Sequence, residues 1–125
     1  MKIKKIEATV LFVKDISKAV NFYVEKLGLE KTEESEDFAN LKVGNSNIAL
    51  LSPKLVNDLI GKKITTPGHS ALIAVEVEDL DKTYKSLKNK SVNFIKEPKM
   101  QSWGQYTAYF TDLDGHIWEI FTWKK

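Results

Sequence analysis

The alternation of apolar and polar residues predicts a strand followed by a helix at the start of the chain. Residues 3–13 form the strand, whose continuous apolar centre at 10–13 is too long for a strand with one solvated face. Apolar residues at helical spacing then extend over 16–27, with Asp15 at the N-cap position and Gly28 at the C′ position. The pattern continues with a weakly patterned acidic segment at 30–37, strands at 38–43 and 48–51 around a Gly-Asn turn, and a helical segment at 53–60.

The second part of the chain repeats this plan. Residues 71–77 form a strand, Asp79 takes the N-cap position, and Leu80, Tyr84 and Leu87 form the apolar stripe of a helix. The helix is followed by a short strand at 92–95, a loop at 97–104, and strands at 105–110 and 117–123, the last two joined by a turn that needs Gly115 at positive φ.

The two halves correspond to one another position by position. Asp15 in the first half matches Asp79 in the second, and residues 48–50 match residues 118–120. We therefore predict one domain of the α+β class, built from two βαβββ modules whose sheets combine, because neither half can bury its own sheet alone. The predicted boundaries are 1–60 for the first module, 61–70 for a linker and 71–125 for the second module.

One carboxylate, Glu119, lies in the otherwise apolar last strand. Side chains alternate along a strand, so Ile117, Glu119 and Phe121 share one face while Trp118 and Ile120 share the other, and both faces are expected to be buried. A carboxylate on a buried face is costly unless it is paired, bound to a metal or protonated. Glu119 is therefore the first candidate for a functional residue, and the alternative is a glutamate at the sheet edge that reaches solvent.

Composition and charge exclude several kinds of site and partner. The chain has no cysteine, which excludes disulfides, thiolate metal sites and cysteine nucleophiles, and it has no arginine for bidentate recognition of phosphates or bases. The net charge of +2 is spread over interleaved lysines and acidic residues, so no nucleic-acid partner is expected. The apolar run after the basic start is too short for a signal peptide or a membrane span, so we predict a cytoplasmic protein with no membrane partner.

Motifs along nearly the whole chain resemble those of a known superfamily. These motifs are Val13-Lys14-Asp15, Phe22-Tyr23 and Leu27-Gly28 in the first half, and Glu97-Pro98, Trp103-Gly104 and Asp112-Leu113-Asp114-Gly115 in the second. Their order and spacing resemble the vicinal oxygen chelate superfamily of glyoxalases, bleomycin-resistance proteins and dioxygenases. The bleomycin-resistance-like branch is the most similar, although Leu113 replaces its usual proline. The resemblance implies an open cup-shaped mixed sheet made by the two modules, with helices on the outside, and a homodimer.

The resemblance also implies where a metal ion would bind. Metal-dependent members carry a ligand in the first and last strand of each module, and these positions fall here on Ala8, Ala49, Leu72 and Glu119. Only Glu119 has a coordinating side chain, and one carboxylate does not hold a divalent ion against water. We therefore predict no metal and no cofactor. The histidines do not change this prediction, because His69 falls in the linker and His116 is expected to be a solvated turn residue.

The implied cup has a composition suited to a small molecule. Alternation places small residues such as Ala74 and Ala108 among aromatic side chains, which is typical of a mostly apolar pocket with a few polar groups. In this assignment Tyr106, Ala108 and Phe110 share the cup face with Glu119. The predicted ligand-binding residues are Phe12, Phe38, Asn40, Trp103, Tyr106, Phe110 and Phe121, and the alternative is that these side chains simply fill a core.

These observations favour a metal-free protein that binds a small amphipathic or aromatic molecule, in the manner of the bleomycin-resistance proteins. One alternative is a lyase or isomerase of the glyoxalase kind, with metal ligands that we have misaligned or that a partner subunit supplies. Another is a metal-free enzyme that uses Glu119 as a general base. A third is a degenerate module that only dimerises or regulates a partner. The sequence identifies neither the ligand nor whether the modules pair within one chain or by exchange between chains.

Overall fold

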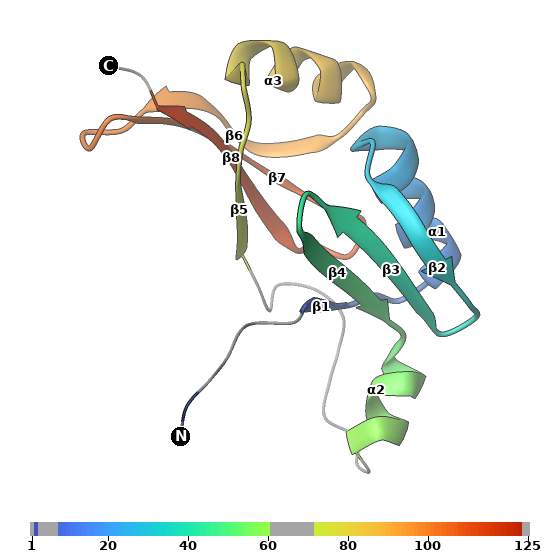
Figure 1. Ribbon diagram of the computed structural model, residues 1–125. Helices are drawn as coiled ribbons and strands as arrows, with labels where there is room; N and C mark the ends of the chain where they lie inside the picture. Colours follow the sequence, from blue (N-terminus) through green and yellow to red (C-terminus); the bar gives the residue numbers. More distant parts are fainter. Residues whose placement is uncertain (1, 3–7, 61–71, 124–125) are drawn as a thin grey trace. The chain divides into compact units, whose positions relative to one another are not determined.

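The computed structural model describes residues 2, 8–60 and 72–123, and the chain divides into two compact units, 1–68 and 69–125. The first unit contains β1 (Thr9–Phe12), α1 (Ile16–Asn21), a π-helical segment η1 (Phe22–Lys26), β2 (Glu30–Glu34), β3 (Phe38–Val43), β4 (Ser46–Leu51) and α2 (Pro53–Ile60) (Figure 1). The second contains β5 (Leu72–Glu76), α3 (Leu80–Asn89), β6 (Asn93–Met100), β7 (Gln105–Thr111) and β8 (Ile117–Trp123). The predicted linker, 61–70, lies outside the described residues, so the module boundaries stay a prediction.

In the first unit a four-stranded mixed sheet packs one of its faces against α1 (Figure 1). The strand order is β1-β4-β3-β2, with β1 parallel to β4 and the other neighbours antiparallel. Leu11, Leu41 and Leu50 project from three adjacent strands into the core, and Ile16 of α1 and Tyr23 of η1 are buried as well. The apolar alternation of these strands therefore supplies one buried face, because a single helix covers only one side of a sheet.

Local sequence signals determine both ends of the first helix. The Asp15 side chain accepts a hydrogen bond from the Lys18 backbone N–H at 3.0 Å, as an N-cap residue does. Gly28 has φ +74°, the left-handed conformation that commonly ends a helix. The helix predicted over 16–27 is observed as α1 followed by η1, where Phe22 and Tyr23 are both buried with their rings edge to face at 5.3 Å.

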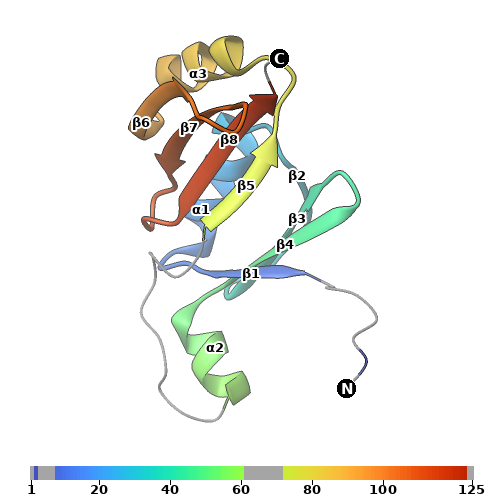
Figure 2. The ribbon, with the colours of Figure 1, turned by 90° about the vertical axis from the view of Figure 1, so that its left-hand side faces the viewer.

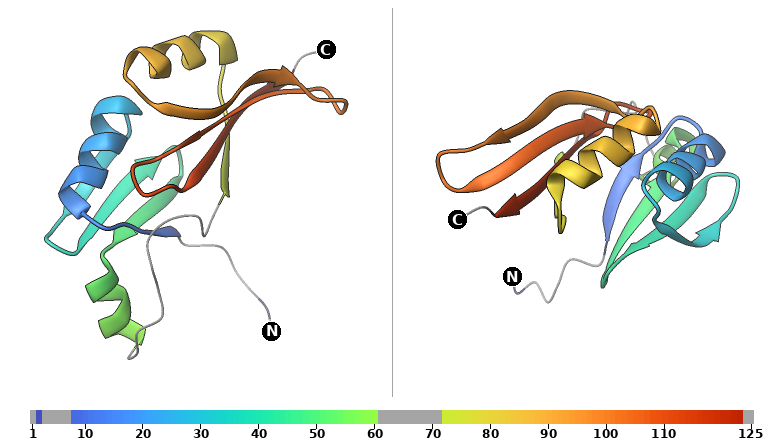
Figure 3. Two further views of the ribbon diagram at one scale, coloured as in Figure 1. Left: turned by 180° about the vertical axis from the view of Figure 1, so that it is seen from behind. Right: turned by 90° about the horizontal axis from the view of Figure 1, so that it is seen from above.

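The second unit repeats the topology of the first, with strand order β5-β8-β7-β6 and β5 parallel to β8. α3 lies across one face of this sheet, as Figures 2 and 3 show from three sides. Between them the rings of Tyr84, Phe94, Phe110 and Trp118 follow one another at centroid separations of 4.7, 5.4 and 6.0 Å. The predicted α+β class and the duplicated βαβββ plan are confirmed.

One strand of the second unit is longer than its sequence pattern predicts. A short strand at 92–95 and a loop at 97–104 are expected, whereas β6 continues from Asn93 to Met100 and includes Glu97 and Pro98. The pairing of β6 with β7 shifts register between Lys96 and Lys99. Pro98 lies within this irregular stretch of an edge strand, where a residue without a backbone N–H is tolerated.

No helix in the described part of the chain is long and apolar enough to cross a membrane. The union of the two sheets into one cup stays a prediction, as does the cytoplasmic location.

Candidate functional site

The face of the second sheet opposite α3, called the open face below, carries Glu119. Strand pairing places Glu119 beside Tyr109 on β7 and beside Ala74 on β5. Two residues further along β5 and β8, Phe121 on β8 pairs with Glu76 on β5. The open face therefore presents carboxylate, phenol and aromatic side chains from three adjacent strands.

The two faces of β8 differ in burial, which corrects the prediction that both are buried. Trp118, Ile120 and Thr122 are buried against the helix side, whereas Ile117, Glu119 and Phe121 are only half-buried. The reason is that α3, the one helix among the described residues of the second unit, covers only one face of the sheet. Glu119 therefore keeps access to solvent within its unit and does not need a buried partner.

Tyr109 is the direct neighbour of Glu119 and was missed by strand alternation. Its hydroxyl donates a hydrogen bond to Glu119 Oε2 at 3.3 Å. Alternation along β7 predicts instead that Tyr106 and Phe110 share the face of Glu119, and this is wrong. Pairing with β8 places Phe110 opposite Trp118, on the helix side.

Tyr106 and Phe110 therefore lie on the side of the sheet that faces α3, not on the open face. The Tyr106 hydroxyl donates to Asp81 Oδ1 on α3 at 2.7 Å, and Phe110 is 1% exposed and stacks on Trp118. Both alternations of β7 contain aromatic residues, so the sequence pattern alone does not decide which set faces the helix. The register with β8 decides it.

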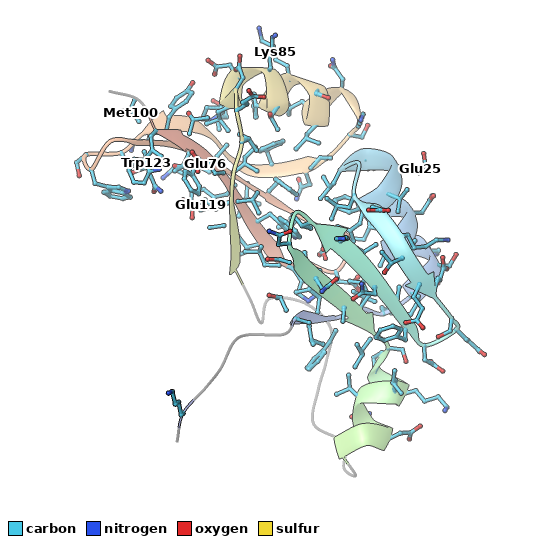
Figure 4. The ribbon with its side chains drawn as sticks, in the orientation of Figure 1. Glu25, Glu76, Lys85, Met100, Glu119 and Trp123 are labelled. Atoms are coloured by element: carbon cyan, nitrogen blue, oxygen red, sulfur yellow. The ribbon has the colours of Figure 1, made fainter. Side chains whose placement is uncertain are left out.

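Two exposed tryptophans lie at the end of the second sheet where Gln105 of β7 pairs with Trp123 of β8. Trp103 is 62% exposed and donates its indole N–H to Gln105 Oε1 at 2.9 Å. Trp123 is 56% exposed and packs edge to face on Phe121 at 5.9 Å between centroids. Figure 4 labels Trp123 near Glu119 and Glu76, where β5 and β8 run side by side. Large aromatic surface therefore lies next to the carboxylates.

The remaining predicted ligand-binding residues lie in the first unit. Phe12 and Phe38 both pair with Leu51 of β4, from its two neighbouring strands, and Asn40 pairs with Ala49. All three residues lie on the sheet face that points away from α1. Asn40 donates through Nδ2 to Thr32 Oγ1 at 2.8 Å and to Asn47 Oδ1 at 3.2 Å. Strand alternation is thus correct for this sheet. That these residues and Glu119 contact one ligand stays a prediction.

The side chains at the family's metal positions do not fit a metal ion. Ala8 and Ala49 carry methyl groups, and position 72 is leucine, so Glu119 is the only coordinating side chain of the four. Among the described residues no three or more His, Asp or Glu side chains come together in a group that would hold a metal. His69 lies outside the described residues.

His116 is fully buried, which corrects the prediction of a solvated turn residue. Asp112 in the same turn accepts hydrogen bonds from the backbone N–H groups of His116 at 2.8 Å and Asp114 at 3.0 Å. Its other oxygen lies 2.8 Å from His116 Nδ1, which donates because a carboxylate accepts. His116 Nε2 has no hydrogen-bond partner among the described residues. The imidazole is closed to solvent, so this pair stabilises the β7–β8 turn rather than acting on a substrate.

A separate cleft of about 640 Å³ lies in the first unit, beside the start of α1 and the turn between β2 and β3. Its lining is mostly charged and polar, with Asp15, Glu36 and Asp37 against Lys14 and Lys31. Ser52 at its wall donates to Asp37 and caps the start of α2. The cleft offers little apolar surface, so it suits an aromatic ligand less well than the open face does.

The contact between Tyr109 and Glu119 predicts a pH-dependent signal. Burial and then the charge of Glu119 raise the pKa of Tyr109 above its ordinary value. We expect Glu119→Gln to lower the pKa of Tyr109, so that its tyrosinate absorbance appears at lower pH than in the wild type. Because the folded-state pKa is raised, the associated stability is present below the ordinary pKa and is lost as pH rises through the folded value.

The matched control for that titration is Asp81→Asn. The hydrogen bond to Asp81 is the main cause that raises the pKa of Tyr106, so this variant moves the Tyr106 signal and leaves that of Tyr109 in place. The Tyr109→Phe variant identifies which ionisation step belongs to Tyr109. An unchanged Tyr109 step in Glu119→Gln would show that the two side chains do not interact in solution.

Comparison with known proteins agrees with the fold. The sequence model of the Glyoxalase/Bleomycin resistance protein/Dioxygenase superfamily matches residues 5–120. The Bacillus subtilis protein YraH is 33% identical over 118 residues, which cover 89% of this chain and 92% of YraH. A metallothiol transferase FosB of Staphylococcus saprophyticus is 28% identical over 120 residues, covering 96% of this chain and 78% of FosB.

Solved structures of members of the same superfamily have a similar fold. A glyoxalase/bleomycin resistance protein/dioxygenase from Nocardioides superposes with a TM-score of 0.87 at 24% identity, covering 100% of this chain and 87% of that one. A superfamily member from Sphaerobacter thermophilus has a TM-score of 0.78 at 29% identity, covering 95% and 97% of the two chains.

Proposed function

Because the chain belongs to the glyoxalase/bleomycin resistance protein/dioxygenase superfamily, we propose that it binds a small amphipathic or aromatic molecule, without a metal ion, on the open face around Glu119. The observation that supports this most is the Tyr109–Glu119 hydrogen bond on a sheet face that also carries Phe121 and Trp123. A mostly apolar surface with a few convergent polar groups is the usual composition of a small-molecule site.

We propose metal-free binding because of the side chains at the positions where related proteins carry metal ligands. Methyl and isobutyl groups at positions 8, 49 and 72 donate no electron pair to a cation. Glu119 therefore serves better as an acceptor that orients a ligand than as a lone metal ligand. The predicted homodimer remains part of the proposal, and it would matter for metal binding only if the partner subunit supplied further ligands.

The experiment uses chelator-treated protein and the neutral planar probe N-phenyl-1-naphthylamine. We expect saturable binding of one probe per chain, read from probe fluorescence, and no change when Ni²⁺, Zn²⁺ or Mn²⁺ is added. Phe121→Ala should weaken probe binding roughly tenfold, because it removes most of a buried aromatic contact worth about 1.5 kcal/mol. Leu113→Ala is the control, since Leu113 is exposed in the β7–β8 turn and lies off the open face.

A second candidate is a metal-dependent enzyme, favoured by the similarity to proteins named metallothiol transferase FosB, which are 26–29% identical to this chain. Calorimetric titration with the same three metals separates the two. Stoichiometric binding tighter than about micromolar, roughly 8 kcal/mol, would overturn the metal-free proposal and make Glu119 the first metal ligand to mutate. Without a metal, Glu119 also remains a candidate general base, held by the Tyr109 hydroxyl.

A further inference from the structure

On the basis of the proposed function, we propose that the ligand of the open face is an organic cation, held by Glu76 and Glu119 and stacked on Trp123. The open face carries two carboxylates next to exposed aromatic rings, and this combination recognises ammonium and guanidinium groups attached to an apolar body.

The two carboxylates are neighbours on adjacent strands. Parallel pairing places Glu119 beside Ala74 and Phe121 beside Glu76. Glu76 and Glu119 are therefore diagonal neighbours on the same face of two adjacent strands. Glu76 is exposed at the edge of the sheet, and Glu119 is half-buried one strand further in. A ligand lying across β5 and β8 therefore meets negative charge from both strands.

Within the described part of the second unit, neither carboxylate is neutralised by an ion pair. Among the described residues no lysine forms an ion pair with Glu76 or Glu119, and the single hydrogen bond to Glu119 comes from the neutral Tyr109 hydroxyl. Among the described residues, Lys96 and Lys99 of β6 lie on the open face, where they pair with β7 and are separated from β8 by that whole strand. A positively charged ligand would therefore meet no competing ion pair at either carboxylate among the described residues.

The aromatic side chains lie where a cation's apolar body would rest. Phe121 lies directly across from Glu76 and two residues along β8 from Glu119, and Trp123 packs edge to face on Phe121 with 56% of its surface exposed. A cation placed within about 6 Å of an exposed ring gains attraction from the ring face in addition to the carboxylate charge. A divalent metal ion would need more oxygen ligands than the two carboxylates provide, whereas an organic cation can use the carboxylates and the rings together, so the site matches an organic cation.

The test uses two phenols of the same shape, 3-(trimethylammonio)phenol and 3-tert-butylphenol, which differ in one positive charge. We expect the cation to bind the wild-type chain at least tenfold more tightly, measured by calorimetry and by quenching of tryptophan fluorescence. Glu76→Gln and Glu119→Gln should each weaken cation binding by about three- to tenfold and leave the neutral phenol unchanged. Glu97→Gln, the same charge change on exposed β6, is the control and should alter neither.

Each outcome separates the charge of the ligand from the binding face itself. Equal affinity for the two phenols, or no effect of Glu76→Gln, would overturn the cation while leaving the open face as a binding surface. Binding of N-phenyl-1-naphthylamine with no binding of the cation would do the same. If none of the three compounds binds in the millimolar range, the cation and the proposed function both fail.

Discussion

Replacing Asp112 with alanine is expected to lower the free energy of unfolding by about 3 kcal/mol. The Asp112 carboxylate accepts hydrogen bonds from the backbone N–H groups of His116 and Asp114 and lies against His116 Nδ1. Alanine would leave the fully buried imidazole N–H and a buried peptide N–H without their acceptor. A buried donor left without a partner costs about 1–3 kcal/mol, so two such donors account for the expected loss.

Urea unfolding followed by far-ultraviolet circular dichroism measures this loss. The matched control is Leu113→Ala in the same turn, where the side chain is 58% exposed and a change within about 0.5 kcal/mol is expected. A loss below about 1 kcal/mol in Asp112→Ala, or equal losses in the two variants, would contradict the buried arrangement of His116.

Replacing Trp118 with alanine is expected to cost about 4 kcal/mol, whereas the same change at Trp123 should cost about 0.5 kcal/mol. Both residues lie in β8, but Trp118 faces α3 and is 3% exposed, while Trp123 is the last residue of the strand and is 56% exposed. The Trp118 ring lies parallel to Phe110 at 6.0 Å, within the aromatic core that reaches Phe94 and Tyr84. Removing it leaves a cavity that neighbouring rings fill only in part.

The two tryptophans should behave oppositely when binding is measured. Trp123→Ala should shift the unfolding midpoint only slightly and lose most of its affinity for 3-(trimethylammonio)phenol, because the exposed ring is lost without damage to the core. Trp118→Ala should unfold at lower urea and bind normally where it is still folded. Equal destabilisation by the two changes would mean that the faces of β8 are assigned wrongly.

The second unit contains two pairs of polar side chains that differ in solvent access. His116 and Asp112 have the pairing of a catalytic dyad, yet the imidazole has no solvent access. Glu119 and Tyr109 form a longer hydrogen bond, at 3.3 Å, on a surface that a ligand can reach. Accessibility, rather than the shorter hydrogen bond, therefore selects Glu119 as the functional candidate.

Much of the candidate site was predictable from the sequence, and the rest depends on contacts between distant parts of the chain. Glu119 is recognisable because it is the one carboxylate among apolar residues in the last strand. Tyr109 was missed because β7 carries aromatic residues in both alternations, and Phe110 and Tyr106 were placed on the wrong face. His116 was missed because a histidine beside Gly115 has the local sequence of an exposed turn.

The sequence by itself determined the features that depend on residues a few positions apart. The caps at Asp15 and Asp79 and the positive φ of Gly28 and Gly115 arise from contacts within one or two turns of chain. The repeated order of strands and helices is visible in the local spacing of apolar residues in each half. Only the tertiary structure decided which face of β7 meets α3, how far β6 extends and that His116 is buried. These depend on strand register and on which face a helix covers, and a shift of one residue in register moves every side chain to the opposite face.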